Sequence, residues 1–193
     1  MLQSLMQFLN SFYPLNEQLA ETIEKNLEVI EVPKQTLLLK DGERCDYVFV
    51  VLKGIARMYY LKDGEEVCSR FSEENQMILS VKSFFARVPG YEYIETIENC
   101  TIARIHHDNL QKIYREFIEF NFVARIITEQ YFMRSEDRLY LLRRQSAEER
   151  YVYLTEHHAS LVLRVPLKYI ASYLGINMET LSRIRKKLAT SKH

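Results

Sequence analysis

The placement of glycine and proline divides this chain of 193 residues into two parts that must be built differently. The first part carries repeated turn signals, whereas the stretch between Ile105 and Pro166 contains neither glycine nor proline. Because both residues interrupt regular structure, we expect short elements in the first part and long helices in the second. The turn signals are Asp41-Gly42, Lys53-Gly54, Asp63-Gly64 and Pro89-Gly90.

Between these turns, apolar side chains recur at every second position, which is the pattern of a half-buried strand. Six short runs show it, at 36–39, 47–52, 55–61, 66–71, 93–97 and 101–105. Short strands divided in this way predict an antiparallel β-roll of the jelly-roll (double-stranded β-helix) type over about 28–105. Residues 2–13 and 15–27 have helical spacing instead, and predict two short helices in front of the roll.

The composition excludes several classes of protein. A hydrophobic fraction of 47% is that of an ordinary globular chain. The three cysteines, Cys45, Cys68 and Cys100, have no CxxC spacing, which argues against a disulfide framework and against a zinc knuckle. The opening residues lack the pattern of a signal peptide, and no run of 18 apolar residues occurs, so we expect no membrane segment and a cytoplasmic location.

The stretch 118–144 predicts a single helix about 40 Å long, since each helical residue adds 1.5 Å. A helix of that length is too long to cap a small roll. Its apolar residues recur at the seven-residue spacing of a two-helix seam, which predicts a parallel homodimer. The alternative is a helix packed on its own domain. The predicted dimer contacts are Val123, Ile126, Gln130, Met133 and Tyr140, with Gln130 interrupting the companion row.

Residues 145–193 are expected to form an all-α domain that ends in a helix-turn-helix. Ser146 and Glu149 have the spacing of a capping box, and 162–166 predicts a short extended segment. Further on, Gly175 can supply the left-handed backbone of a tight turn, and Asn177 can cap the helix that follows. The apolar positions that would face inward are Ile170, Ala171 and Leu174 on the first helix, and Leu181, Ile184 and Leu188 on the second.

If those side chains are buried, the opposite face of the second helix, 178–189, must point outward. From Leu167 onward the chain has six basic residues and one acidic residue, whereas 1–166 has 20 basic and 25 acidic residues. A basic end on an acidic body indicates a polyanion partner. Arg can pair with guanine O6 and N7, and Glu can accept from cytosine N4. The predicted contacts to double-stranded DNA are Lys168, Met178, Glu179, Thr180, Ser182, Arg183, Lys186 and Lys187.

The run from Glu179 to Arg183 resembles the Glu-Thr-(Val/Leu)-(Gly/Ser)-Arg motif in the recognition helix of the Crp/Fnr family. The resemblance covers nearly the whole chain, and it implies an α+β protein with a cyclic-nucleotide-binding-like sensor domain at 1–117, a dimerisation helix at 118–144 and a DNA-binding domain at 145–193. It implies a bacterial transcription regulator that binds an inverted repeat and has RNA polymerase as a partner. Many family members carry another arginine where this chain has Met178.

Family members that bind cyclic AMP share a phosphate cassette, a Gly-Glu turn followed by an Arg-x-Ala segment. This chain aligns 80–85 with the first half and 90–92 with the second, and neither motif is present. Lys82 and Arg87 lie nearby and could serve a different anion. We therefore expect no binding of cyclic nucleotides, and the sequence does not identify another ligand for the sensor.

Metal and iron–sulfur sites are also not expected. No cysteine precedes Cys45, as an N-terminal iron–sulfur site would require. The adjacent pairs His106-His107 and His157-His158 cannot form chelating faces, because neighbouring side chains diverge in strands and in helices.

Three classes of function account for the sequence to different degrees. A dimeric DNA-binding regulator accounts for the helix-turn-helix and for its charged outer face. The alternative is a ligand-binding or protein-interaction module whose helix-turn-helix does not read DNA. An enzyme ranks third, since the sequence has no glycine-rich phosphate loop, nucleophile elbow or carboxylate pair at a meaningful spacing.

Overall fold

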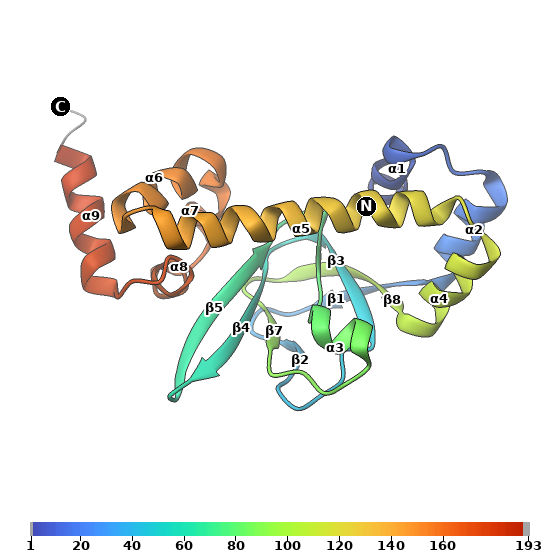
Figure 1. Ribbon diagram of the computed structural model, residues 1–193, viewed down its shortest axis with the longest axis horizontal. Helices are drawn as coiled ribbons and strands as arrows, with labels where there is room; N and C mark the ends of the chain where they lie inside the picture. Colours follow the sequence, from blue (N-terminus) through green and yellow to red (C-terminus); the bar gives the residue numbers. More distant parts are fainter. Residues whose placement is uncertain (1, 191–193) are drawn as a thin grey trace. The chain divides into compact units, whose positions relative to one another are not determined.

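The computed structural model describes residues 2–190, and these form a mixed α+β protein (Figure 1). The helices are α1 (Leu2–Phe12), α2 (Glu17–Asn26), α3 (Val81–Ala86), α4 (His107–Glu116), α5 (Phe120–Arg144), α6 (Ala147–His157), α7 (Ala159–Arg164), α8 (Leu167–Tyr173) and α9 (Met178–Thr190). The strands are β1 (Leu27–Val32), β2 (Leu37–Leu39), β3 (Tyr47–Lys53), β4 (Ala56–Lys62), β5 (Glu65–Ser72), β6 (Gln76–Ile78), β7 (Tyr93–Thr96) and β8 (Cys100–His106). The predicted fold class is confirmed.

The described residues divide into two compact units, which are treated separately below. The roll unit comprises the residues up to Met58 together with Phe71–Tyr131. The C-terminal unit comprises Tyr59–Arg70 and the residues from Phe132 onward. The division therefore passes through α5 and through the β4–β5 hairpin. The domain boundaries expected from the sequence, at 117 and 144, lie instead just before α5 and at its end.

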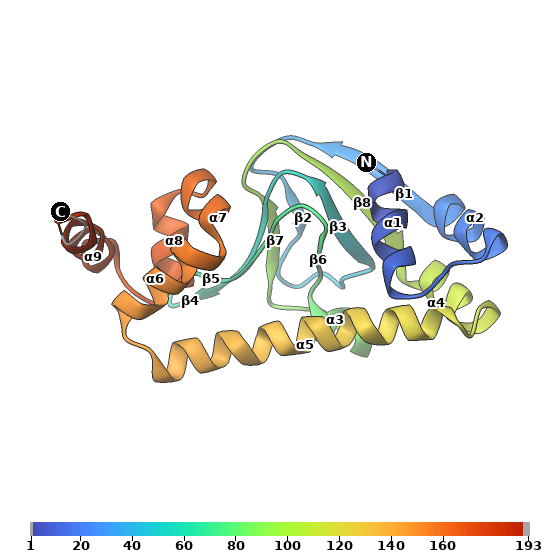
Figure 2. The ribbon, with the colours of Figure 1, turned by 90° about the horizontal axis from the view of Figure 1, so that it is seen from above.

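The roll is built from two four-stranded sheets, with strand orders β1-β8-β3-β6 and β2-β7-β4-β5. The pairings of β1 with β8, β2 with β7, and β3 with both β6 and β8 are antiparallel. Apolar side chains fill the interior, as the alternating pattern predicted; Val51, Ile78, Ile94 and Ile102 are fully buried. Helices α1, α2 and α4 gather at one end of the roll and contribute to the same core (Figures 1 and 2).

A buried ion pair joins two strands of the second sheet. The guanidinium of Arg57, on β4, lies 2.5 Å from a carboxylate oxygen of Glu95, on β7, and the Arg57 side chain is 1% exposed. The Nε–H of Arg57 also donates to Glu95, at 2.7 Å. A buried charge must be paired to be tolerated, and the Glu95 carboxylate provides such a partner for Arg57.

Helix α5 is continuous over 25 residues, close to the predicted range of 118–144. In the roll unit, Phe120 and Val123 from its first turns belong to the hydrophobic core. None of the helices within residues 2–190 is both long enough and apolar enough to cross a membrane.

The C-terminal unit is helical apart from the tip of the β4–β5 hairpin. Ser146 and Glu149 form the predicted capping box at the start of α6. The prediction of an extended segment over 162–166 is wrong, because α7 continues to Arg164 and only the last two residues, Val165 and Pro166, lie outside the helix. Leu161 and Val165 are both buried. The spacing of four residues between them fits a helical turn as well as it fits a strand, and here the tertiary contacts favour the helix.

We expect Glu95→Ala to lower the free energy of unfolding of the roll unit by about 1–5 kcal/mol, because it removes a charged hydrogen-bond partner of a buried guanidinium. The double variant Arg57→Met/Glu95→Leu should recover much of that loss. Glu116→Ala, which removes an exposed carboxylate, is the control. Urea unfolding followed by circular dichroism measures all three, and a loss below about 1 kcal/mol for Glu95→Ala would contradict the pairing.

Candidate functional site

The tight turn between α8 and α9 depends on Gly175. Its φ of 66° is in the left-handed region, which glycine adopts at little cost. The Gly175 N–H donates to the carbonyl of Ser172 at 3.0 Å, and the Ile176 N–H donates to the carbonyl of Ala171 at 3.0 Å. These bonds end α8 and redirect the chain toward α9.

Helix α9 starts as the sequence predicted. The Thr180 N–H donates to the Asn177 side chain at 2.8 Å, which satisfies one of the free amides of the first turn. The predicted inner faces of both helices are buried, at Ile170, Ala171, Leu174, Leu181 and Ile184. Leu188, near the end of α9, is half-buried. The paired helices therefore form the expected helix-turn-helix.

The outer face of α9 carries most of the predicted DNA contacts. Met178, Glu179, Ser182, Arg183 and Lys186 are exposed, and Thr180 is half-buried. Among residues 2–190, the side chains of Glu179, Arg183 and Lys186 form no ion pair. Charged groups that project outward from the first turns of a helix are available to a ligand. Lys192, counted in the basic end, lies outside the described residues.

The two remaining lysines of the predicted set are placed differently. Lys187 lies on the flank of α9 and its Nζ donates to Glu148 of α6, at 2.6 Å. Lys168 is on α8, and its ammonium lies 4.6 Å from the centre of the Tyr169 ring. Neither belongs to the outer face of α9, and sequence spacing alone did not reveal the partner of Lys187, which is 39 positions away.

The exposed side of α5 differs from the predicted seam at one position. Met133 and Tyr140 are 57% and 54% exposed, and Ile126 and Gln130 are half-buried. Val123 is 0% exposed and packs in the core of its own chain, so it cannot face a partner in this structure. Its neighbour Phe122 is 52% exposed and lies on the same helical face as Ile126 and Met133.

In the roll unit, the two segments aligned with the phosphate cassette contact each other directly. The Ser80 hydroxyl, at the start of α3, donates to the Glu92 carboxylate. A Cβ added to Gly90 would meet the Ser80 Oγ at 3.1 Å and the Ser83 Cβ at 3.2 Å. The cassette region thus holds an internal carboxylate and is closely packed.

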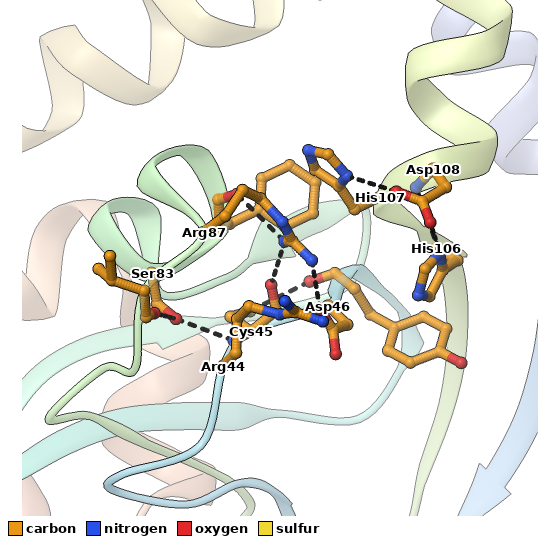
Figure 3. Close-up of polar contacts among 11 residues, drawn as sticks. Arg44, Cys45, Asp46, Ser83, Arg87, His106, His107 and Asp108 are labelled. Atoms are coloured by element: carbon orange, nitrogen blue, oxygen red, sulfur yellow. Dashed lines mark hydrogen bonds and ion pairs between the residues drawn. The ribbon is translucent and has the colours of Figure 1, made fainter.

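A second polar cluster surrounds Arg87, at the C-terminal end of α3 (Figure 3). Arg87 has a left-handed backbone, with φ 56°. Its guanidinium donates to the carbonyls of Cys45 and Phe84, at 3.0 and 3.2 Å, and forms an ion pair with Asp46. Arg87, which the sequence suggested as a candidate for an anion, therefore joins α3 to the loop before β3.

Asp46 is held by two guanidiniums, since Arg44 also contacts it, at 2.8 Å. Burial raises the pKa of Asp46, but the hydrogen bonds and charges of Arg44 and Arg87 outweigh that effect and hold it below its usual value. Burial also raises the pKa of the Cys45 thiol, which argues against a reactive thiolate.

A pocket of about 560 Å³ opens beside this cluster. Its apolar wall includes Leu39 and Phe49, and Arg44, Asp46 and Arg87 lie at its polar side. The sequence did not single out Arg44 or Asp46, because their link to Arg87 spans about forty residues.

The histidine pairs do not form metal sites in the described part of the chain. His107 Nδ1 lies 2.9 Å from Asp108, and His106 Nδ1 lies 3.9 Å from the same carboxylate. The rings of His157 and Tyr153 are stacked, with centres 4.2 Å apart. Within residues 2–190, no three His, Cys, Asp or Glu side chains are grouped closely enough to hold a metal.

Comparison with known proteins agrees with this architecture. Residues 29–117 match the family model of the cyclic nucleotide-binding domain. FixK2 from Bradyrhizobium japonicum has a similar structure, with a TM-score of 0.73 and 24% identity over 86% of each chain. A protein from Eubacterium rectale assigned to the Crp/Fnr family of transcriptional regulators has a TM-score of 0.73 and 19% identity, over 94% of this chain and 88% of that one. The chain has the fold of the Crp/Fnr regulators.

A further similar structure is CLP, described as a c-di-GMP-responsive global regulator in Xanthomonas campestris. It has a TM-score of 0.74 and 14% identity, over 92% of this chain and 93% of that one. Among these structures, the Eubacterium rectale protein is described as a transcriptional regulator and CLP as a global regulator. A search of curated protein sequences finds no match. The resemblance to the Crp/Fnr family, inferred from the motif at 179–183, is confirmed at the level of the fold.

Proposed function

We propose that this chain is a homodimeric transcription regulator of the Crp/Fnr type that binds an inverted-repeat DNA site in the bacterial cytoplasm. The observation that carries the proposal is the outer face of α9, where Glu179, Arg183 and Lys186 project together without ion-pair partners among the described residues. Regulation of transcription also implies RNA polymerase as a partner of the DNA-bound dimer.

The chemistry of this face suits the major groove. Arg183 has the planar donor fork that pairs with guanine O6 and N7, and Glu179 can accept from cytosine N4. Lys186 provides a mobile positive charge for a phosphate, and Met178 offers an apolar contact to a thymine methyl. Because Lys187 is already paired with Glu148, we assign the main phosphate contact of α9 to Lys186.

The dimer is proposed to form along α5. Phe122, Met133 and Tyr140 are more than half exposed although they are large and largely apolar, and Ile126 lies on the same face. An apolar stripe of this length on one helix is suited to a second copy of the same helix. A parallel pair would present two copies of α9, as an inverted repeat requires.

The sensor is proposed not to bind cyclic nucleotides. In the cassette region, the Glu92 carboxylate accepts the hydroxyl of Ser80. A cyclic phosphate placed beside Glu92 would meet a like charge, and the aligned segment 90–92 supplies no guanidinium to offset that repulsion.

We expect Arg183→Ala to weaken binding to the cognate duplex by about 1–3 kcal/mol and to have much less effect on scrambled DNA. Lys186→Ala should weaken both duplexes alike and reduce the salt slope by about one unit. Arg185→Ala, which removes the same charge from the flank of α9, is the control for Arg183. Titrations of duplexes selected from genomic fragments, at several salt concentrations, measure these effects. Equal losses on both duplexes for Arg183→Ala would show that the reading face is assigned wrongly.

We expect Met133→Glu to convert the dimer to a monomer at micromolar concentration, because it places like charges opposite each other in the seam. Thr128→Glu adds the same charge at an exposed position away from the apolar stripe, and should leave the dimer intact. Light scattering measures both, and a monomeric wild-type protein would refute the proposed dimer.

Calorimetry should detect no binding of cyclic AMP or cyclic GMP at concentrations up to about 1 mM. A dissociation constant of about 1 mM corresponds to a binding free energy near −4 kcal/mol. Micromolar affinity of the wild-type protein for either nucleotide would overturn this part of the proposal. Glu92→Gln removes the internal charge and retains the shape of the side chain, so it serves as the matched variant.

A further inference from the structure

Strand β5 is at the edge of its sheet, and this edge lies beside α8 within the C-terminal unit (Figures 1 and 2). Residues two apart along a strand direct their backbone groups to the same edge. Glu66 and Cys68 have this relation. Unpaired backbone groups at a sheet edge are available to any donor or acceptor that approaches them.

Ser172, on α8, uses its hydroxyl to pair with this edge. The Cys68 N–H donates to the Ser172 Oγ at 2.8 Å. The same hydroxyl donates to the Glu66 carbonyl, also at 2.8 Å. One side chain of the helix-turn-helix thus makes two hydrogen bonds to the backbone of β5, and both its donor and its acceptor are used.

Arg138, on α5, links the same two elements. Its Nη2 donates to the carbonyl of Tyr173 at 2.9 Å and to the carbonyl of Cys68 at 3.3 Å. The guanidinium carbon also lies 3.7 Å from the centre of the Tyr173 ring, within the range of a cation–π contact. Arg138 therefore holds α5, α8 and β5 together through three separate contacts.

These contacts leave the proposed reading face uncovered. Ser172 and Tyr173 are at the end of α8, immediately before the turn, whereas Glu179, Arg183 and Lys186 are exposed on α9. The link to β5 and α5 is therefore compatible with DNA in the major groove. It does not act as a cover over α9.

We propose that Ser172 and Arg138 are positioning residues that fix the helix-turn-helix on α5 and β5, and so set the half-site spacing that the dimer accepts. This inference rests on the proposed function, because the spacing has meaning only for a dimer on DNA. A rigid link keeps the two copies of α9 at one separation. If the link is loosened, each copy of α9 can turn independently of the other. Each copy must then be ordered when DNA binds, and the loss of conformational entropy weakens binding.

The measured quantity is how the affinity for DNA depends on the spacing of the half-sites. A substitution that only destabilised the fold would not change that dependence. One added base pair moves a half-site by about 3.4 Å and rotates it by about 35° around the DNA axis. The wild-type dimer should therefore lose at least about tenfold in affinity when one base pair is added or removed. A variant with a loosened link should bind the optimal site roughly three- to tenfold more weakly and tolerate the altered spacing better.

The experiment compares Ser172→Ala and Arg138→Met with the wild-type protein on the selected inverted repeat and on duplexes with one or two base pairs added or removed. Ser172→Thr keeps the hydroxyl and should restore the wild-type spacing profile. Arg134→Ala removes an exposed arginine from the same helix that makes none of these contacts, and should leave the profile unchanged. Thermal unfolding identifies any variant that fails to fold. If either Ser172→Ala or Arg138→Met does not fold, the spacing profile of the other variant tests the inference.

Hydrogen exchange tests the link without DNA. The Cys68 amide should exchange at least about tenfold faster in Ser172→Ala than in the wild-type protein or in Ser172→Thr. The inference would be overturned if the exchange rate of the Cys68 amide did not change. It would also be overturned if both folded variants had the spacing profile of the wild type. Either result would leave the proposed function standing. A wild-type protein that binds no selected duplex would instead overturn the proposed function, and the inference about spacing with it.

Discussion

The burial of one face of α5 is the constraint on which the rest of the molecule depends. Phe120 and Val123 are held in the core of the roll unit, so the rotation of the helix about its axis is fixed from its first turn. Within the roll unit, that rotation leaves the neighbouring Phe122 more than half exposed. In the C-terminal unit, Met133 and Tyr140 are exposed, while Arg138, on another side of α5, meets β5 and α8.

Much of the fold could be predicted from the sequence because its signals are local. Alternation of apolar residues marked the strands, and Gly175 and Asn177 marked the turn and the start of α9, since each acts on backbone within a few residues. Two errors arose where local patterns are ambiguous. The heptad spacing fits Val123 as well as Phe122, and only the packing of the roll excludes Val123 from the seam. Likewise, the residues of α7 suit a strand or a short helix, and their tertiary contacts favour the helix.

The candidate sensor was less predictable, since its contacts join residues that are distant in sequence. Lack of the cassette motif could be recognised from the residues at 80–85 and 90–92, but the bond between Ser80 and Glu92 could not. The same holds for the Arg57–Glu95 pair and for the contacts of Arg87 with Cys45 and Asp46. In each case a charged group is satisfied within the protein. A ligand that binds one of these charged groups would have to compete with the partner that the group already has.

The pairing of Lys187 with Glu148 affects how this domain would exchange between DNA sequences. A lysine that already has a carboxylate partner gains from a phosphate only the difference in free energy between the two ion pairs. It returns to its internal partner when the phosphate moves away. In the proposed complex, the ammonium group would have a charged neighbour both in the free protein and on DNA. A phosphate contact made by such a lysine would add less affinity than one made by a lysine without an internal carboxylate partner. The weaker contact would shorten the time spent on any one site and favour rapid transfer along the duplex.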